Sequence, residues 1–423
     1  MCQTKSRPDY KWVILAVCFF MEFLCLGFCS SNAGLYTAAV TNALNIDRAV
    51  YAVGNSIRYI VQVFVVLSFS TMINRFGIKK MVCAGLCCLI GAALLRATGT
   101  NVYYFYIAGV LHGTGMVFVG GTMASTIIRQ WFHQDLGKYT GIVMSANGIG
   151  GAIAAQIVSP IINNGEVFGY RKAYLLAACI AFGIGIVIMI FLRDAPTDDP
   201  VVVKKEAKKA RGPLWVGMDY ALVKKKPYFY VTAVLIFLTG ITLQSIGSIT
   251  IVNLTDMGFP AAFIATTATL SSLTLAFSKF LSGAVYDKRG LRFSLLMCQL
   301  AALLMLMLNG MLSNSPLGMA LSVAATLLSS FAMPLETVVI PLLTNDLFGT
   351  ASYTKVLGVF TAMNTLGLCL GSPIGELVRN FFGNYRPCFW LFTVVLIIVI
   401  IGFQFVLKAA ARDKKAILAE ENS

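Results

Sequence analysis

The sequence is dominated by long apolar stretches that recur along its whole length. A stretch of about 18 or more apolar residues crosses the ~30 Å hydrocarbon core of a bilayer as an α-helix. Only 12% of the 423 residues are charged and 58% are hydrophobic, which is too little charge for the surface of a soluble domain of this size. We therefore predict an all-α, polytopic membrane protein. The twelve predicted spans are residues 12–36, 50–72, 81–98, 103–128, 140–162, 173–192, 228–252, 261–285, 293–312, 317–344, 355–378 and 387–408.

The basic residues are placed unevenly around these spans. If both termini lie in the cytoplasm, 25 of the 33 Lys and Arg residues fall on the cytoplasmic side, five on the other side and three within spans. This asymmetry agrees with the positive-inside rule. We expect a multi-pass protein of the cell membrane with cytoplasmic N- and C-termini, and a basic linker at 193–227 that lies near anionic headgroups. The chain has no separate basic domain, so the net charge of +15 does not indicate nucleic-acid binding.

The two halves of the chain repeat each other. The turn "STMINRFGIKK" (70–80) aligns with "GAVYDKRGLRF" (283–293), and "GIVMSANGIG" (141–150) aligns with "GVFTAMNTLG" (358–367), each at an offset of about 215 residues. Together with "FGYRKAY" (168–174) and "GNYRPCF" (383–389), they indicate a duplicated six-helix unit. The predicted parts are a first six-helix bundle at 1–192, a linker at 193–227, a second bundle at 228–412 and a cytoplasmic tail at 413–423.

The repeated turn carries a recognisable motif. The pattern G-x-x-x-D-[RK]-x-G-x-[RK] after spans two and eight of a twelve-span chain resembles the major facilitator superfamily. The second copy fits it, whereas the first has Ser70 for the leading glycine and Asn74 for the aspartate. The resemblance implies two pseudo-symmetric bundles that rock around a central site, with the turns acting on the cytoplasmic gate. The gating residues it implies are Arg75, Gly77, Lys79, Gly283, Asp287, Lys288, Gly290 and Arg292.

Within this superfamily, the chain resembles the branch of oxalate/formate antiporters and monocarboxylate transporters. The segments "RQWFHQDLGKYTGIVMSANGIG", "FGYRKAY" and "PLLTNDLFG" carry this resemblance. The branch has an arginine in span eight, eight residues before the acidic or amide position of the turn, and here Lys279 stands eight residues before Asp287. Oxalate-carrying members have a second cation in span eleven, where this chain has Met363. The resemblance therefore favours monocarboxylates, unless Arg58 balances a second carboxylate.

Lys279 also stands out without any family, because a charge within a span is costly and marks function. Ser272, Ala276, Ser282 and Gly283 share its helix face, and this small, polar stripe predicts a water-lined cavity. One hypothesis is that Lys279 binds a substrate carboxylate; the other is a structural ion pair with Glu336 or Glu22. Lysine is a point charge, so it selects carboxylate geometry less strictly than arginine.

Further polar residues within spans are candidates for the same cavity. Asn55, Arg58 and Gln62 form a polar stripe on span two and are predicted to bind substrate, as are Asn147 and Asn364 in spans five and eleven. The alternatives for Arg58 are a role in gating and snorkelling of its side chain to the membrane surface. The two asparagines are equally compatible with contacts between helices. Glu22 and Glu336 are candidates for carrying a coupled proton, or alternatively for neutralising a buried cation permanently.

These features predict a secondary active transporter of small organic anions, monocarboxylates in the first place, by alternating access with proton symport or anion exchange. The alternative is an exporter of drugs or other amphipathic solutes, which a mainly aromatic cavity and a paired Lys279 would favour. The chain has two histidines, His112 and His133, and no HExxH motif, so an enzyme is not expected. A metal or cofactor is not expected either, and we expect a monomer whose partners are its anionic substrate, protons and the lipid bilayer.

Overall fold

The computed structural model describes residues 10–31, 33–46, 48–132, 134–162, 166–194 and 217–420, and these are almost entirely helical. His133 and most of the predicted linker, residues 195–216, lie outside the described residues. Ten helical segments within the described part are long and apolar enough to cross a membrane. Helices α11 and α12, of 30 and 29 residues, complete the twelve predicted spans.

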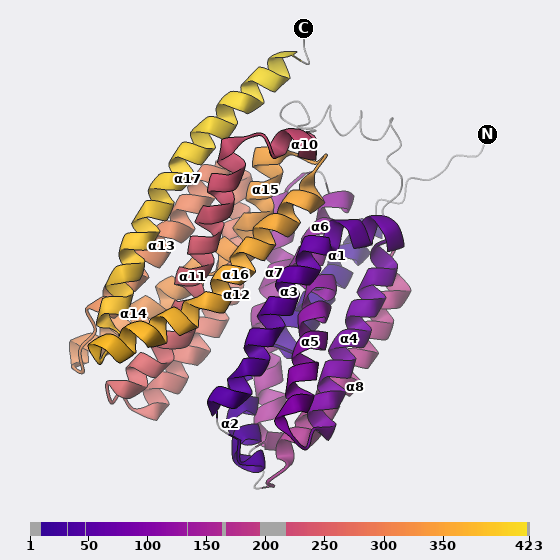
Figure 1. Cartoon of the computed structure of the whole chain (residues 1–423). Coiled ribbons are helices and arrows are strands. Elements are labelled where there is room, and N and C mark those ends of the chain that lie inside the picture. Colours follow the sequence, from indigo (N-terminus) through magenta and orange to yellow (C-terminus); the bar gives the residue numbers. More distant parts are fainter. Residues whose placement is uncertain are drawn as a thin grey trace.

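Spans one to six form the first half of the molecule. Their helices are α1 (Tyr10–Glu22), η1 (Phe23–Phe28), α2 (Ala33–Leu44), α3 (Arg48–Phe76), α4 (Ile78–Thr98), α5 (Val102–Val119), α6 (Gly121–Trp131), α7 (Leu136–Ile162) and α8 (Gly169–Phe191). Figure 1 shows them as one bundle, coloured indigo to magenta. The large buried side chains Phe69, Phe118 and Met123 belong to the apolar core of this bundle.

Spans seven to twelve form the second half, which follows the short helix α10 (Tyr220–Val223). Their helices are α11 (Pro227–Asp256), α12 (Ala261–Arg289), α13 (Leu291–Gly310), α14 (Pro316–Ala332), η2 (Leu335–Val339), α15 (Ile340–Phe348), α16 (Tyr353–Phe382) and α17 (Arg386–Glu420). This second bundle has its own core, around Phe348 and Phe360 (Figure 1). The predicted tail at 413–423 begins inside α17, which continues as a helix to Glu420.

The glycines that match in the repeat make equivalent contacts in the two halves. Gly150 on α7 packs against Gly27 of η1, and a Cβ atom built on Gly27 would lie 2.7 Å from the Gly150 Cα. In the second half, Gly367 on α16 packs against Gly240 on α11. Small residues allow two helix backbones to approach this closely. The repeated "G" at the end of both segments therefore reflects the same packing of span five on span one and of span eleven on span seven.

Three spans are interrupted within their length. Span one changes to the π-helix η1 after Glu22, and span four breaks at Gly120, whose ψ of −164° is extended. Span ten is interrupted between α14 and α15, where Pro334 precedes the π-helix η2. Irregular backbone at membrane depth is tolerated where it faces protein or a polar cavity, and π-helical segments are frequent at functional sites. The three interruptions therefore point to the same region between the halves.

The two halves pack against each other along α7 and α12, and they make further contacts at the end of the molecule that carries the turns at Gly77 and Gly290, which we call the gate end. Figure 1 shows the bundles approaching each other near α6 and α15 and diverging toward α2 and α14. Gly137 on α7 and Gly283 on α12 face each other so closely that a Cβ on Gly283 would collide with the Gly137 carbonyl oxygen. Only glycine permits this approach.

Two further contacts join the halves at the gate end. Ser70 Oγ on α3 lies 3.3 Å from Thr354 Oγ1 on α16. Arg129 Nε, near the end of α6, donates a 2.6 Å hydrogen bond to Asn345 Oδ1 in α15. Span four of one half is thereby connected to span ten, its counterpart in the other half.

Candidate functional site: a cavity between the halves

A cavity of about 360 Å³ lies between the two halves. It is lined by spans one, two, four and five of the first half and by spans eight, ten and eleven of the second. Its polar lining residues are Glu22, Ser30, Ser31, Arg58, Gln62, Thr122, Asn147, Lys279, Glu336, Thr337, Thr361, Asn364 and Thr365. The structure thus brings together every predicted binding and proton-carrying residue except Asn55. That prediction is not supported, since Asn55 is exposed and does not line the cavity.

The contacts between the halves separate this cavity from the gate end. On α12, the cavity residue Lys279 precedes Gly283, and on α3 Gln62 precedes Ser70. On α15, Pro341 lines the cavity and Asn345 makes the contact between halves. In each case the contact lies on the gate side of the cavity. The structure is therefore closed at the gate end.

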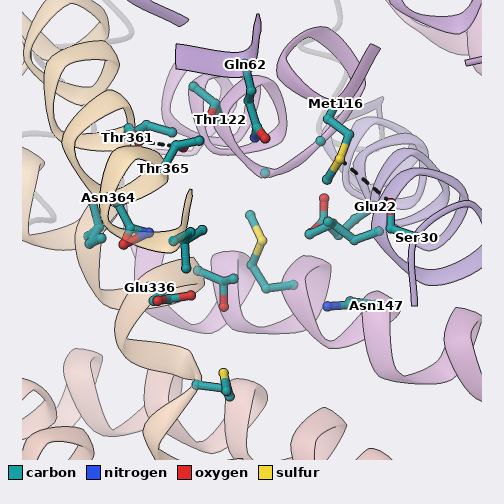
Figure 2. A pocket seen from close by; sticks show the side chains of 18 of the residues that line it. Glu22, Ser30, Gln62, Met116, Thr122, Asn147, Glu336, Thr361, Asn364 and Thr365 are labelled. Carbon is teal, nitrogen blue, oxygen red and sulfur yellow. Dashed lines mark hydrogen bonds between the residues drawn. The ribbon is translucent and has the colours of Figure 1, made fainter. Parts of the chain in front are cut away.

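Lys279 is almost completely buried, with 1% of its surface exposed, and it lines the cavity. Within the described part of the chain, no carboxylate lies within 4.0 Å of its ammonium group. Glu22 and Glu336 are the two carboxyl groups among the described residues that line the same cavity. Figure 2 shows these two acids on opposite sides of the cavity, one from each half. Lys279 is thus a buried cation with two acids nearby and no direct ion pair.

The small stripe beside Lys279 does not line the cavity, which corrects the interpretation of that face. Ser272, Ala276 and Gly283 pack against glycines of α7, and the Ser282 hydroxyl lies 3.3 Å from Ser294 Oγ in α13. From α12, only Leu275 and Lys279 line the cavity among the described residues. A stripe of small side chains suits close helix packing as well as it suits a water-filled space.

Glu22 is fully buried at the end of α1, and neither of its carboxylate oxygens has a hydrogen-bond partner in the described structure. Its Oε1 lies 3.8 Å from the position of a Cβ on Gly121, the first residue of α6. The N-terminus of a helix carries a partial positive charge that favours an anion. The break in span four therefore places that charge beside Glu22.

Glu336 lines the cavity from the second half, in the π-helix η2 of span ten. Its Oε1 is buried and has no partner among the described residues. Buried carboxyl oxygens without a hydrogen bond are rare in native structures and call for an explanation. The two carboxyl groups line the same cavity as Lys279, one from each half.

Arg58 provides the second cation of the cavity. Its guanidinium lies over the Tyr59 ring, 4.4 Å from the ring centroid, and Nη1 lies 3.7 Å from Met116 Sδ. Its Nε is buried and lacks an acceptor in the described part. With both carboxyls ionised, two cations balance two anions, so the cavity carries no net charge.

The two asparagines differ in their contacts. Asn147 Oδ1 accepts a 3.0 Å hydrogen bond from Ser31 Oγ, which joins span five to the turn after span one. Asn364 Oδ1 has no partner in the described residues and lies 3.0 Å from the position of a Cβ on Gly240. Asn147 and Asn364 also line the cavity, so each contacts a neighbouring helix and is accessible to a ligand in the cavity.

The predicted gating turns are unequal. The Asp287 carboxylate accepts hydrogen bonds from Gly137 N (2.9 Å) and Lys138 N (2.6 Å), and it thereby caps the first turn of α7 in the other half. Gly77 and Gly290 have φ of +82° and +80°, which glycine adopts without strain. Arg75, Lys79 and Lys288 are exposed side chains of the turns, and Arg292 Nε donates to Gln404 Oε1 within the second half. The first turn has Asn74 at the position of Asp287, so it has no carboxylate that could cap a helix in the same way.

Several cavity residues could not be singled out from the sequence. Ser30 and Met116 are linked by a 3.7 Å contact, visible in Figure 2, and Thr361 and Thr365 face the cavity from α16. Serine, threonine and methionine are common in spans, so their presence does not indicate which of them line a cavity. The adjacent glycines Gly120 and Gly121 were a usable signal for the break in span four.

Twelve membrane-crossing helices in two similar halves around a central polar cavity define a membrane transporter. The chain matches the model of the Major Facilitator Superfamily over residues 15–308 and 232–422, and it belongs to this family.

Individual similarities are distant but cover nearly the whole chain. The chain is 22% identical to monocarboxylate transporter 13 of Bos taurus over 397 residues, which is 92% of this chain and 88% of that protein. It is 20% identical to multidrug resistance protein 2 of Bacillus subtilis (strain 168), covering 98% and 99% of the two chains. Among solved structures, the proton:xylose symporter XylE superposes with a TM-score of 0.76 at 14% identity, over 95% of this chain and 97% of that one. This last similarity supports the fold alone.

Proposed function

We propose that this protein is a secondary active transporter of small organic anions, monocarboxylates in the first place, and that Lys279 binds the substrate carboxylate. The observation that carries the proposal is the burial of Lys279 in the central cavity without an ion pair among the described residues. Burying a charged side chain within a membrane span costs free energy, so such a charge is expected to interact with a group of opposite charge. A substrate carboxylate would be such a partner.

The charge balance of the cavity supports proton symport. Two cations, Lys279 and Arg58, face two carboxyls, Glu22 and Glu336. If one carboxyl takes up a proton, the cavity carries one positive charge, which matches one carboxylate. An anion and a proton would then enter together and leave the cavity neutral. Glu336 is our candidate for the coupled proton, and anion exchange remains the alternative mode.

The geometry favours an anion carrier over an exporter of amphipathic solutes. Tyr59 is the only aromatic residue among the described residues that line the cavity, and Lys279 is not paired with an acid there. The similarity to a monocarboxylate transporter also supports an anion carrier. The similarity to a multidrug resistance protein supports an exporter of amphipathic solutes, which is our second candidate. Met363, at the position of the second cation of oxalate carriers, packs against the core of the second half.

We further propose that the gate end faces the cytoplasm, so that the described state is open to the outside. The basic side chains at this end and the positive-inside rule support this orientation. The proposed protein is a monomer of the cell membrane, with the bundles at 1–192 and 228–412 acting as the two moving halves.

Uptake into proteoliposomes tests this function. We expect uptake of labelled short monocarboxylates, driven by an inward proton gradient and competed weakly by oxalate. Lys279→Ala should abolish uptake, whereas Lys415→Ala, which removes an exposed lysine of α17, should leave it unchanged. If Lys279→Ala transports at the wild-type rate, or if amphipathic cations compete better than carboxylates, the proposal is wrong.

A further inference from the structure

A second cavity, of about 350 Å³, lies outside the central cavity and within the second half. It is bounded by the start of α13, the last turns of α15 and the gate-end part of α17, and we call it the side cavity. Its polar lining residues are Arg292, Asp346, Gln404, Lys408 and Lys414. Figure 1 shows α13 and α17 at the outer edge of the molecule, away from the first half. The side cavity is therefore separate from the proposed transport path.

The side cavity is positively charged. Its one acid, Asp346, accepts a 2.8 Å hydrogen bond from Tyr286 Oη, and the charge of Lys414 acts on it. Arg292 and Lys408 form no ion pair within 4.0 Å in the described structure. Arg292, Lys408 and Lys414 together with an ionised Asp346 give the side cavity a net charge of two positive units.

The side cavity also contains an unused hydrogen-bond donor. Arg292 Nε donates to Gln404 Oε1 at 2.9 Å, which fixes the orientation of the amide. The amide nitrogen, Gln404 Nε2, is buried and has no acceptor among the described residues. Leaving such a donor unpaired costs stability, so the geometry calls for an acceptor. Two cations and an amide donor suit an anion with several oxygens, such as phosphate.

The position along α17 indicates how such an anion would arrive. The helix has no charged residue from Pro387 to Leu407 and then carries Lys408, Arg412, Asp413, Lys414 and Lys415. This change from apolar to charged residues is typical of the point where a spanning helix leaves the hydrocarbon. The side cavity therefore lies at headgroup depth. We propose that it binds the phosphate group of an acidic phospholipid.

Titration of acidic lipid into the purified full-length protein, followed by native mass spectrometry, tests this proposal. The probe is phosphatidylglycerol, with phosphatidylcholine as the neutral reference. The test variant combines Arg292→Gln with Lys408→Gln, which removes two charges that line the side cavity. The control combines Arg412→Gln with Lys415→Gln, which removes two charges from exposed residues that do not line it. The first pair should weaken saturable lipid binding about tenfold for each charge-assisted hydrogen bond lost. The second pair should lose only the weak surface attraction.

Two controls keep the result decisive. Gln404→Leu removes the unpaired amide donor together with the oxygen that accepts from Arg292 Nε, and it should also weaken lipid binding without lowering the melting temperature in the absence of lipid. Inorganic phosphate and glycerol phosphate, titrated in detergent, should not bind saturably if the source is a lipid. Equal losses for the two double variants would overturn the site, and phosphate binding as tight as lipid binding would overturn the lipid assignment.

Discussion

The hydrogen bonds between Asp287 and the first turn of α7 should control the stability of the closed gate. In Asp287→Asn, the amide keeps one acceptor oxygen and loses the negative charge at the helix N-terminus. The loss of one of the two hydrogen bonds costs about 0.5–1.5 kcal/mol, and the loss of the favourable interaction between an exposed anion and the helix dipole costs about 0.3–1 kcal/mol. A loss of about 1.5 kcal/mol shifts the equilibrium between closed and open gate about tenfold.

Hydrogen–deuterium exchange reports this shift directly, because Gly137 N and Lys138 N are the two donors. In Asp287→Asn these amides should exchange about tenfold faster, and the transport rate should fall because one half of the cycle needs a closed gate. Substrate affinity should stay nearly unchanged, since Asp287 lies eight residues, or about 12 Å along the helix, from Lys279. Arg289→Gln, an exposed neighbour, is the control. Wild-type exchange in the first turn of α7 would refute this account of the gate.

Three further predictions concern the cavity and the contact between the halves. Glu336→Gln should abolish accumulation driven by a proton gradient but preserve counterflow exchange; accumulation in this variant would mean that Glu336 does not carry the proton. Gly283→Ala should prevent the close approach to Gly137 and shift the protein toward an open gate, since overpacking costs about 1–3 kcal/mol; cysteine labelling from the gate end measures this, and unchanged labelling would contradict it. Arg58→Gln should raise the KM for monocarboxylates without unfolding the protein, and a KM equal to that of the wild type would exclude Arg58 from the binding site.

The sequence was sufficient to predict the spans, the repeat and the paired turns, because each depends on local composition or on a short motif. The hydropathy of a 20-residue stretch is enough to place a span, and a charge such as Lys279 within it is conspicuous. The structure places Lys279, Arg58, Glu22 and Glu336 around one cavity, as expected of charged residues that avoid lipid, and their roles there stay predictions.

Other features depend on which helices meet, and one sequence does not contain that information. The stripe of Ser272, Ala276 and Gly283 suggested a water-lined face, but it packs against α7. Asn55 shares the helical spacing of Arg58, yet it is exposed and does not line the cavity. The capping of α7 by Asp287 joins residues 150 positions apart, and only the assembled halves reveal it.

The thermal stability of Lys279 variants, measured with and without substrate, shows whether Lys279 binds the substrate carboxylate. If Lys279 binds a substrate carboxylate, Lys279→Ala should lose the melting-temperature increase that a monocarboxylate gives the wild type, while the empty protein stays as stable. Lys279→Arg should retain the increase, because the charge is kept and its fork-shaped group binds carboxylates well. If Lys279 were instead half of a structural ion pair, Lys279→Ala would strand a buried carboxylate and destabilise the empty protein by about 3–5 kcal/mol. A large loss of stability without ligand, with monocarboxylate binding still detectable, would contradict the account.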